Sequence, residues 1–186
     1  MSTGHPANYP TELEHDVALR DGTLVHIRPI RPDDASRLQD LHGRLSLNSA
    51  YQRFFSVVKR LPPGWARILA TVDYHRRLAL VAEDPAGAGA LIAVGRYDAI
   101  DESDDVEVAF VVQDSWQNRG LGTIIFDEIL RAAAARSYRR FLAYVLADNQ
   151  RMLDMITRFT RVESRKVEHS VTELRFTLVP AQETSP

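Results

Sequence analysis

The stretch Val106-Glu-Val-Ala-Phe-Val-Val-Gln-Asp-Ser-Trp-Gln-Asn-Arg-Gly-Leu-Gly-Thr123 decides the fold of this chain. Its first part, Val106 to Val112, is rich in β-branched and apolar residues, which is typical of a buried strand. The period then changes, because apolar side chains recur at the three- and four-residue spacings of one helix stripe: Leu121, Ile124, Ile125, Ile129 and Ala132. The stretch therefore predicts a strand, a glycine-containing loop and a helix.

The glycine loop has the properties of a phosphate-binding turn. A turn that opens a helix presents backbone N–H groups without intrahelical partners at the positive end of the helix dipole. Gly120 and Gly122 have no Cβ atom, so an anion can approach the main chain, and Thr123 adds a hydroxyl donor. The loop is neither a Walker A sequence nor a three-glycine Rossmann fingerprint. Two glycines alone are also explained by a plain strand-to-helix turn.

The whole pattern is more specific than the two glycines. Gln117-x-x-Gly120-x-Gly122, between a strand that carries Glu107 and an amphipathic helix, resembles the pyrophosphate loop of the GNAT superfamily of acyl-CoA-dependent N-acyltransferases. That loop reads Gln/Arg-x-x-Gly-x-Gly/Ala in the family. The segment Ile27-Arg-Pro-Ile-Arg-Pro-Asp-Asp34, with Tyr51-x-Arg53-Phe54-Phe55 further on, is similar to a GNAT branch that includes bacterial protein-lysine acetyltransferases. The resemblance spans about Leu19 to Leu178.

Composition limits the class of protein. The 186 residues include no cysteine, which excludes disulfides, thiolate catalysis and cysteine-ligated zinc. The 23 basic and 25 acidic residues are well mixed, and the net charge of −2 does not favour nucleic acid or an anionic membrane as a partner. The apolar runs are shorter than a membrane span, and no signal-peptide pattern opens the chain. We therefore expect a cytoplasmic protein. We also expect no metal site, because the histidines lack metal-ligand spacing.

The expected organisation is one GNAT domain over residues 13–179, with flexible tails at 1–12 and 180–186. The fold class is α/β in the broad sense (α+β), with six or seven strands in a mixed, mostly antiparallel sheet and three or four helices. Asp33-Asp34 is predicted to cap a helix that runs to about Leu45, and a second helix starts between Ser46 and Ser49. The resemblance implies that the two central strands splay to admit the pantetheine arm of CoA.

Glu107 is the candidate general base. A free lysine, with a pKa near ~10.4, is only ~0.04% neutral at pH 7, so a carboxylate that accepts its proton assists attack on a thioester. Glu107 is the only ionisable residue from Val106 to Val112, and strict alternation places it on the face of Ala109 and Val111. Apolar surroundings raise a carboxyl pKa. The resemblance implies the role of base, and the alternative is an ion pair with an arginine or an exposed edge position.

The remaining site residues are assigned to acetyl-CoA, the expected cosubstrate. Backbone N–H groups near Phe110, Val111 and Val112 are expected to polarise the thioester carbonyl and to pair with pantetheine amides. The glycine loop is expected to hold the pyrophosphate through Gln117, Asn118, Arg119, Gly120, Leu121, Gly122 and Thr123. Asn149 matches the family's asparagine that contacts the CoA arm. It also has the position of a helix N-cap, and both roles are compatible.

Two positions depart from the family pattern. Many members have a tyrosine seven residues after the asparagine, acting as general acid, and this chain has Ile156 there. Neither Tyr138 nor Tyr144 is assigned that role. The usual Gly-Phe after the last helix is replaced by Thr160-Arg161. A thiolate of moderate pKa leaves without an acid, so we expect activity to survive.

Two charged segments have both a functional and a structural interpretation. In the acidic loop from Asp98 to Asp105, the run Asp101-Glu102-Ser103-Asp104-Asp105 could attract a lysine in a basic protein segment, or it is a solvated turn. The basic run from Arg136 to Arg140 either complements the end of the central helix or meets the 3′-phosphate of CoA.

The expected acceptor is the ε-amine of a lysine in a protein such as an acyl-CoA synthetase, in a ternary complex with acetyl-CoA. A small amine is one alternative, and a non-catalytic acyl-CoA sensor is another. From the family we expect a monomer or homodimer.

Overall fold

The computed structural model describes residues 6–87, 89–101 and 103–179. They form an eight-stranded sheet in the order β1-β2-β3-β4-β5-β6-β8-β7, in which β5 and β6 are parallel and the other neighbours are antiparallel. This confirms the predicted mixed, mostly antiparallel sheet. The strands are β1 (His15–Ala18), β2 (Leu24–Pro29), β3 (Arg77–Glu83), β4 (Leu91–Ala99), β5 (Asp105–Val112), β6 (Arg140–Leu146), β7 (Thr160–Glu168) and β8 (Val171–Leu178).

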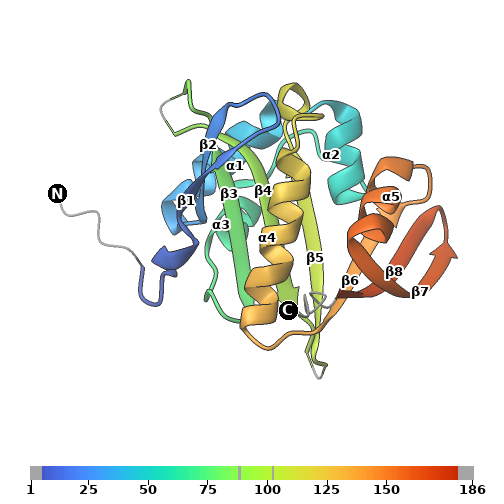
Figure 1. Cartoon of the computed structure of the whole chain (residues 1–186). Helices are drawn as coiled ribbons and strands as arrows, with labels where there is room; N and C mark the ends of the chain where they lie inside the picture. The colour runs from blue at the N-terminus through green and yellow to red at the C-terminus, as the bar shows by residue number, and fades with distance from the viewer. Residues whose placement is uncertain (1–5, 88, 102, 180–186) are drawn as a thin grey trace.

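Helices cover both faces of the sheet (Figure 1). The α-helices are α1 (Ala35–Gly43), α2 (Leu47–Phe54), α3 (Pro63–Ala70), α4 (Leu121–Ala135) and α5 (Gln150–Phe159), and the 3-10 helices are η1 (Thr11–Leu13), η2 (Pro32–Asp34) and η3 (Asp114–Trp116). Helix α4 packs on one face, against β3, β4 and β5, while α1 and α3 pack together on the opposite face. Each face has its own cluster of buried apolar side chains.

Close packing of α4 depends on a glycine in β4. A Cβ atom added to Gly95 would lie 2.3 Å from Cγ2 of Ile125, a distance that real side chains do not adopt. Gly95 is opposite Phe110 in the register of β4 and β5. The glycine therefore fixes the separation between α4 and the two strands that position the glycine loop.

The alternation predicted for β5 is confirmed. Val106, Val108 and Val112 belong to the cluster under α4, and Val111 lies among residues of α1, α2 and α3 on the other face. Glu107 shares that second face, since its side chain alternates with those of its neighbours. The base candidate therefore points away from α4 and toward the side where α2 lies.

The central strands part as the resemblance implied. The parallel register joins Asp105 to Arg140, Val106 to Phe141 and Glu107 to Leu142, and it ends there. From Val108 to Val112, β5 pairs only with β4 among the described residues. The sheet thus opens directly after Glu107.

The N-terminal prediction is wrong in two respects. Tyr9 is only 9% exposed and its ring packs edge-on against Tyr74, so the ordered chain begins before residue 13 and the expected tail does not extend to residue 12. Strand β1 was also not predicted, because it is only four residues long and mostly exposed, which leaves no clear apolar alternation. Residues 1–5 and 180–186 of the expected tails lie outside the described residues.

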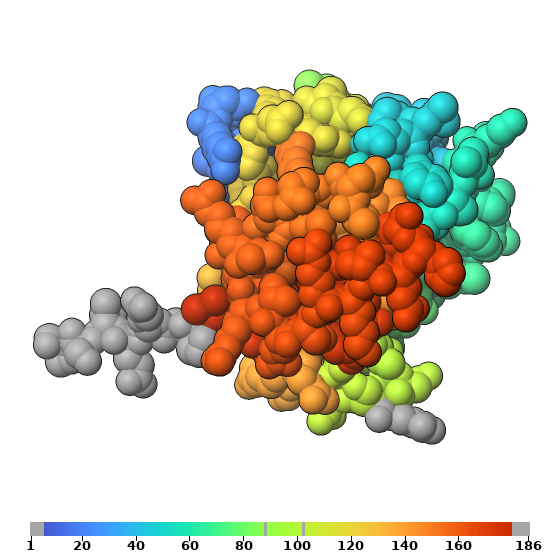
Figure 2. Space-filling view, turned by 90° about the vertical axis from the view of Figure 1, so that its right-hand side faces the viewer, coloured from blue at the N-terminus to red at the C-terminus, as the bar shows by residue number. Residues whose placement is uncertain are grey.

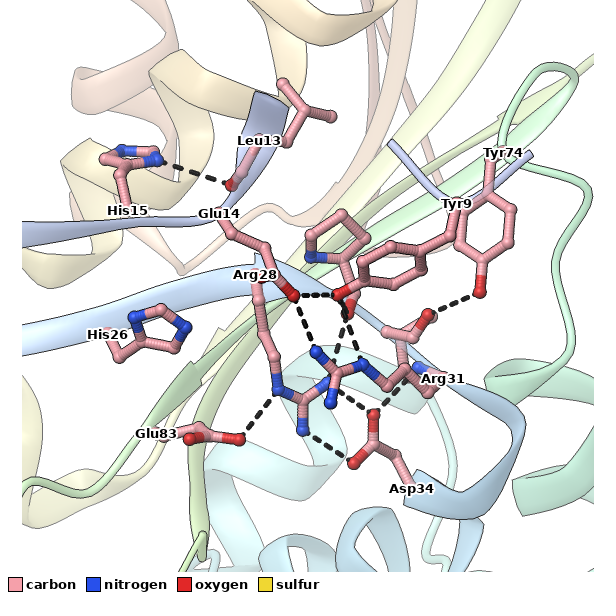
Figure 3. A network of polar contacts seen from close by, with 12 residues as sticks. Tyr9, Leu13, Glu14, His15, His26, Arg28, Arg31, Asp34, Tyr74 and Glu83 are labelled. Atoms are coloured by element: carbon pink, nitrogen blue, oxygen red, sulfur yellow. Dashed lines mark hydrogen bonds and ion pairs between the residues drawn. The ribbon is translucent and has the colours of Figure 1, made fainter. Parts of the chain in front are cut away.

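A buried network of charges anchors α1 to the sheet (Figure 3). Arg28 is 2% exposed, donates two hydrogen bonds to the fully buried Asp34 at 2.7 and 2.8 Å, and donates another to Glu83 at 2.7 Å. Asp34 also accepts from the backbone N–H of Arg31 at 2.8 Å. The Asp34 carboxylate therefore makes no side-chain cap on α1, and the predicted cap is replaced by an ion pair with Arg28 of β2, six residues earlier in the chain. The second helix does have the predicted cap, at Ser46.

The segment predicted as an acidic loop is shorter than expected. Asp98 belongs to β4, and Asp105 belongs to β5. Asp105 is 6% exposed and pairs with Arg140 and Arg175, each at 2.7 Å. Glu102 lies outside the described residues. The buried carboxylate of Asp105 holds β5, β6 and β8 together, so it does not serve as a lysine-attracting charge.

Candidate active site

An open cleft of about 580 Å³ lies where the strands part. Its walls come from the end of β5, the glycine loop and the start of α4, with α2 and α5 on either side. Figure 2 shows the orange surface that includes α5 directly below the segments of the glycine loop (yellow) and of α2 (cyan). Nine of the predicted site residues line the cleft: Phe110, Val111, Val112, Gln117, Asn118, Gly120, Gly122, Thr123 and Asn149.

The backbone of the glycine loop has the conformation that its sequence predicts. Gly120 is the N-cap of α4 with φ of +95°, a left-handed conformation that favours glycine. Asn118 also has positive φ, at 63°. No side chain caps α4, so its first N–H groups are left for a ligand at the positive end of the helix dipole. This arrangement suits a pyrophosphate.

Gln117 joins three walls of the cleft. Its Nε2 donates to the carbonyl oxygen of Val112 at 3.0 Å and to Oγ of Ser49 on α2 at 3.2 Å, while its Oε1 accepts from Arg151 of α5 at 3.3 Å. Asp114 strengthens the same junction, because it accepts from the hydroxyls of Ser46 and Ser49. The position of Gln117 in the loop motif therefore has a structural explanation: its side chain closes the end of the cleft.

The exposed edge of β5 presents backbone donors to the gap. Gln113 donates its N–H to Ile92 on β4, and amides of an antiparallel ladder alternate in direction. The N–H of Val111 therefore also faces β4, whereas those of Phe110 and Val112 face the gap. The bond from Gln117 to the Val112 carbonyl lies on that gap side as well. Of the three predicted backbone donors, the register favours Phe110 and Val112.

Glu107 lies in a small pocket of about 50 Å³ that adjoins the cleft. Gln52, Arg53, Phe110 and Met152 line both cavities. The side chain of Glu107 is exposed, as one of the two structural alternatives expects, yet desolvation still raises its pKa, against the opposing effect of Arg53. In the described part of the chain Glu107 makes no ion pair. The structural alternative of an ion pair with an arginine is therefore not what the structure shows.

Asn149, Ile156 and Thr160 lie on or next to α5, the helix that follows β6. Asn149 lines the cleft and its Oδ1 accepts from the N–H of Met152 at 3.3 Å, so it is the N-cap of α5. Ile156, which replaces the family's tyrosine, is 1% exposed and forms part of the wall of the Glu107 pocket. Thr160 is buried and donates to the carbonyl of Ile156 at 2.7 Å, which gives α5 a defined end without the Gly-Phe pair.

Some predicted residues do not face the cleft. The side chain of Arg119 stacks over Trp116 at 4.3 Å and pairs with Asp21 at 2.6 Å, and Leu121 is fully buried in the core. Both contribute through the backbone of the loop only. The arginines of the basic run at the end of α4 make hydrogen bonds within the protein: Arg136 donates to the carbonyl oxygen of Tyr74, and Arg139 donates to that of Ala134. The location of this run at the opposite end of α4 from the glycine loop removes the alternative role with the 3′-phosphate.

Sequence reasoning missed the arginines of the cleft. Arg20, Arg53, Arg151 and Arg158 line it against a single acidic residue, Asp154. Arg151 and Arg158 are seven residues apart on α5, a helical spacing that could have identified a basic stripe. Arg20 had no such signal, because it is brought to the site by a contact between distant segments: its backbone N–H donates to the carbonyl oxygen of Arg119. The excess of arginine matches a ligand that carries several phosphates.

The residues of the cleft fit acetyl-CoA. The N–H groups without intrahelical partners at the start of α4, the four arginines, and the exposed strand edge match a pyrophosphate followed by an amide-containing arm. Among the described residues no group of histidine, aspartate and glutamate could hold a metal ion. Within the same ranges, no helix combines the length and apolar character needed to cross a membrane.

Comparison with known proteins identifies the class. The model of the acetyltransferase (GNAT) family matches residues 44–160, and the chain belongs to this family. It is an acyltransferase that uses acetyl-CoA. Acetyltransferase PA5475 of Pseudomonas aeruginosa is 30% identical over 141 residues, which cover 74% of this chain and 75% of that protein.

Two further relatives identify the branch. Acetyltransferase Pat of Mycolicibacterium smegmatis is 31% identical over 153 residues, which cover 81% of this chain and 45% of that protein. The crystal structure of the GNAT domain of S. lividans PAT aligns with a TM-score of 0.83 at 36% identity and covers 92% of this chain and 100% of that one. The chain therefore has a Pat-like GNAT domain, as its sequence motifs predicted.

Proposed function

We propose that this protein acetylates the ε-amine of a lysine in a protein substrate, by direct attack in a ternary complex with acetyl-CoA. The observation that carries the proposal is the place of Glu107. It lies at the point where β5 and β6 part, beside the cleft and on the α2 side of the sheet. An amine that enters from that side meets the carboxylate before it meets the strand edge.

The protein's own groups have two roles in the reaction: they accept a proton from the amine and they stabilise negative charge on the carbonyl oxygen. Acetyl-CoA supplies an acetyl thioester to the gap between the strands. Glu107, with its raised pKa, accepts the proton of the amine as the N–C bond forms and the C–S bond breaks, and the electron pair of that bond stays on sulfur. The gap-facing N–H groups of Phe110 and Val112 are placed to stabilise negative charge on the carbonyl oxygen. Ile156 supplies no proton, so CoA leaves as the thiolate.

The surface around the pocket supports a protein as the acceptor. Phe55 and Tyr144, which line the Glu107 pocket, are 36% and 40% exposed, and nearby in the sequence Tyr51 and Val57 are 42% and 73% exposed. Large apolar side chains that gather at one place on a surface mark sites of protein contact. A small polar amine would not need this rim.

The experiment measures CoA release with an acyl-CoA synthetase and, separately, with a panel of polyamines and amino acids. We expect transfer to a lysine of the synthetase, located by mass spectrometry, and little transfer to the small amines. Phe55→Ala should raise the KM for the protein acceptor several-fold and leave the KM for acetyl-CoA unchanged. Val167→Ala, at an exposed position on β7, is the matched control and should change neither value.

The outcomes separate the three interpretations of the site. Transfer to small amines at a higher kcat/KM than to any protein lysine would overturn the choice of acceptor. Binding of acetyl-CoA without transfer to any acceptor would indicate a sensor and overturn the enzymatic proposal.

A further inference from the structure

Arg53 of α2 lies at the junction of three cavities. It lines the large cleft, the pocket that holds Glu107, and a third cavity of about 30 Å³ under α1 and α3. The first of these fits CoA, and the second contains the proposed base. A side chain at this junction is within reach of the acyl group of the thioester and of the residues next to the acceptor amine.

Among residues 6–87, 89–101 and 103–179, the guanidinium of Arg53 makes no ion pair or hydrogen bond with a carboxylate, although the charges of Glu107 and Asp98 act on it from a greater distance. The guanidinium lies over the ring of Phe54, with Cζ 5.1 Å from the ring centroid. The neighbouring Arg96 differs, because it pairs with Asp98 at 2.7 Å, and Asp98 also pairs with Arg77 at 2.9 Å. The nearby aspartate is thus already shared by two other arginines.

The surroundings of Arg53 do not favour an isolated cation. Desolvation, together with the like charge of Arg96, lowers the pKa of Arg53 to about 10. A second anion that binds in the pocket would offset the desolvation of the Arg53 charge and its repulsion by Arg96. Arginine presents a planar fork of N–H donors that matches a carboxylate with two parallel hydrogen bonds.

We propose that Arg53 binds a carboxylate that a substrate brings into the pocket beside Glu107. The carboxylate belongs either to a dicarboxylic acyl group on CoA, such as succinyl, or to an acidic residue next to the acceptor lysine. A phosphate of CoA is a poorer match, because the glycine loop, Arg20 and Arg151 lie along the large cleft, and Arg53 alone of the four cleft arginines also lines the small pocket. The inference rests on the proposed function, which assigns the transfer step to this pocket.

The first arm of the test concerns the acyl group and does not depend on turnover. Calorimetry gives the Kd values of acetyl-CoA and succinyl-CoA for the native protein, Arg53→Gln and Arg53→Lys. If the acyl group carries the carboxylate, the native protein prefers succinyl-CoA, Arg53→Gln reduces that preference by about 10-fold or more, and Arg53→Lys retains part of it. Arg151→Gln, which changes an arginine of the large cleft only, should weaken both thioesters equally.

The second arm concerns the acceptor. The kcat/KM values for lysine peptides with glutamate or glutamine beside the lysine are compared in the same variants, with acetyl-CoA as donor. If the acceptor carries the carboxylate, Arg53→Gln removes a preference of about 10-fold or more for the glutamate peptide. A loss of preference in either arm supports the proposal and tells which substrate supplies the carboxylate.

The proposal is overturned if Arg53→Gln changes neither ratio while the variant still binds acetyl-CoA. Transfer by the native protein with unchanged ratios would leave the proposed function intact and remove the role of Arg53. A succinyl-CoA preference that depends on Arg53, without transfer to any amine, would retain the carboxylate site and reject the enzymatic role.

Discussion

Two clusters of charge in this molecule differ in how completely their members are paired. In the first, Arg28 is buried and bonded to Asp34 and Glu83. In the second, Arg53 and Glu107 line the same small pocket and act on each other's pKa, yet neither makes an ion pair with a described residue. The pKa of Asp34 is lowered, chiefly because bonds from Arg28 outweigh desolvation, whereas desolvation raises the pKa of Glu107.

This difference in pairing distinguishes a structural cluster of charges from a functional one. A buried pair whose bonds are all made holds two elements in place and has no capacity left for a ligand. A charge without a partner, beside a cavity, is destabilised until a substrate or proton arrives, and this is the usual condition of a functional group. Changes in the first cluster should therefore affect folding, and changes in the second should affect catalysis.

The largest effect is expected at Glu107. Glu107→Gln should lower kcat/KM for acetyl transfer by ~10²–10⁴ at pH 7, since the base is lost. The Kd of acetyl-CoA should stay within a factor of about two. Glu128→Gln is the control, because burial also raises the pKa of Glu128, but this residue pairs with His15 away from the cleft. Equal loss of activity in both variants would contradict the role of Glu107.

Asp34→Ala tests the opposite cluster. The change leaves Arg28 buried without its main partner, and we expect the free energy of unfolding in urea to fall by ~3–5 kcal/mol. Asp127→Ala removes an exposed pair with Arg131 on α4 and should cost ~0–0.5 kcal/mol. The comparison would fail if the two variants were equally stable.

The two clusters should respond to pH with opposite sign. The lowered pKa of Asp34 gives stability that is fully present above its unfolded pKa of about 3.9 and is lost as pH falls through the folded value. The raised pKa of Glu107 makes its ionised form a destabilising group above the folded value, so Glu107→Gln should be more stable than the native protein at pH 7 and equal to it below about pH 4. Urea unfolding at pH 4, 5.5 and 7 measures both trends. In the same protein, kcat/KM should rise with pH through the raised pKa.

The smallest effect is expected at the glycine loop. Gly120→Ala forces a side chain into a left-handed conformation, at a cost of ~1–2 kcal/mol, and its Cβ would lie 3.2 Å from Cγ of Arg20. The Kd of acetyl-CoA should rise, because the N–H groups that bind the pyrophosphate shift. Gly64→Ala, on α3 with open space around it, should leave binding unchanged. Equal Kd values for the two variants would show that the loop conformation is not needed.

Local patterns explain what could be predicted from the sequence. The change of period after Val112 located the strand, the loop and α4, and alternation placed Glu107 on the correct face. The burial of Tyr9 was missed, since its packing depends on Tyr74, which is 65 residues away in the chain. Asp34 has the position of a helix cap, but Arg28 of β2, six residues earlier in the chain, binds its carboxylate, and no local spacing rule predicts that pair.

Arg53 shows the same limit at the site. The sequence around Arg53 indicated a family branch, but no pattern in that sequence predicted that Arg53 would line three cavities. It reaches them because α2 is held against the end of β5 by bonds from Ser46 and Ser49 to Asp114, which are contacts between segments more than 60 residues apart. Such contacts carry no period along the chain.

The parting of β5 and β6 also affects the thermodynamics of the whole molecule. Strands β1 to β5 form one antiparallel set and β6, β8 and β7 another, and their shared edge has three residue pairs in register. A thioester whose arm lies along both edges would bind the folded form and not the unfolded chain, so its concentration would add RT ln(1 + [L]/Kd) to the stability. The melting temperature of this protein should then follow the supply of acetyl-CoA.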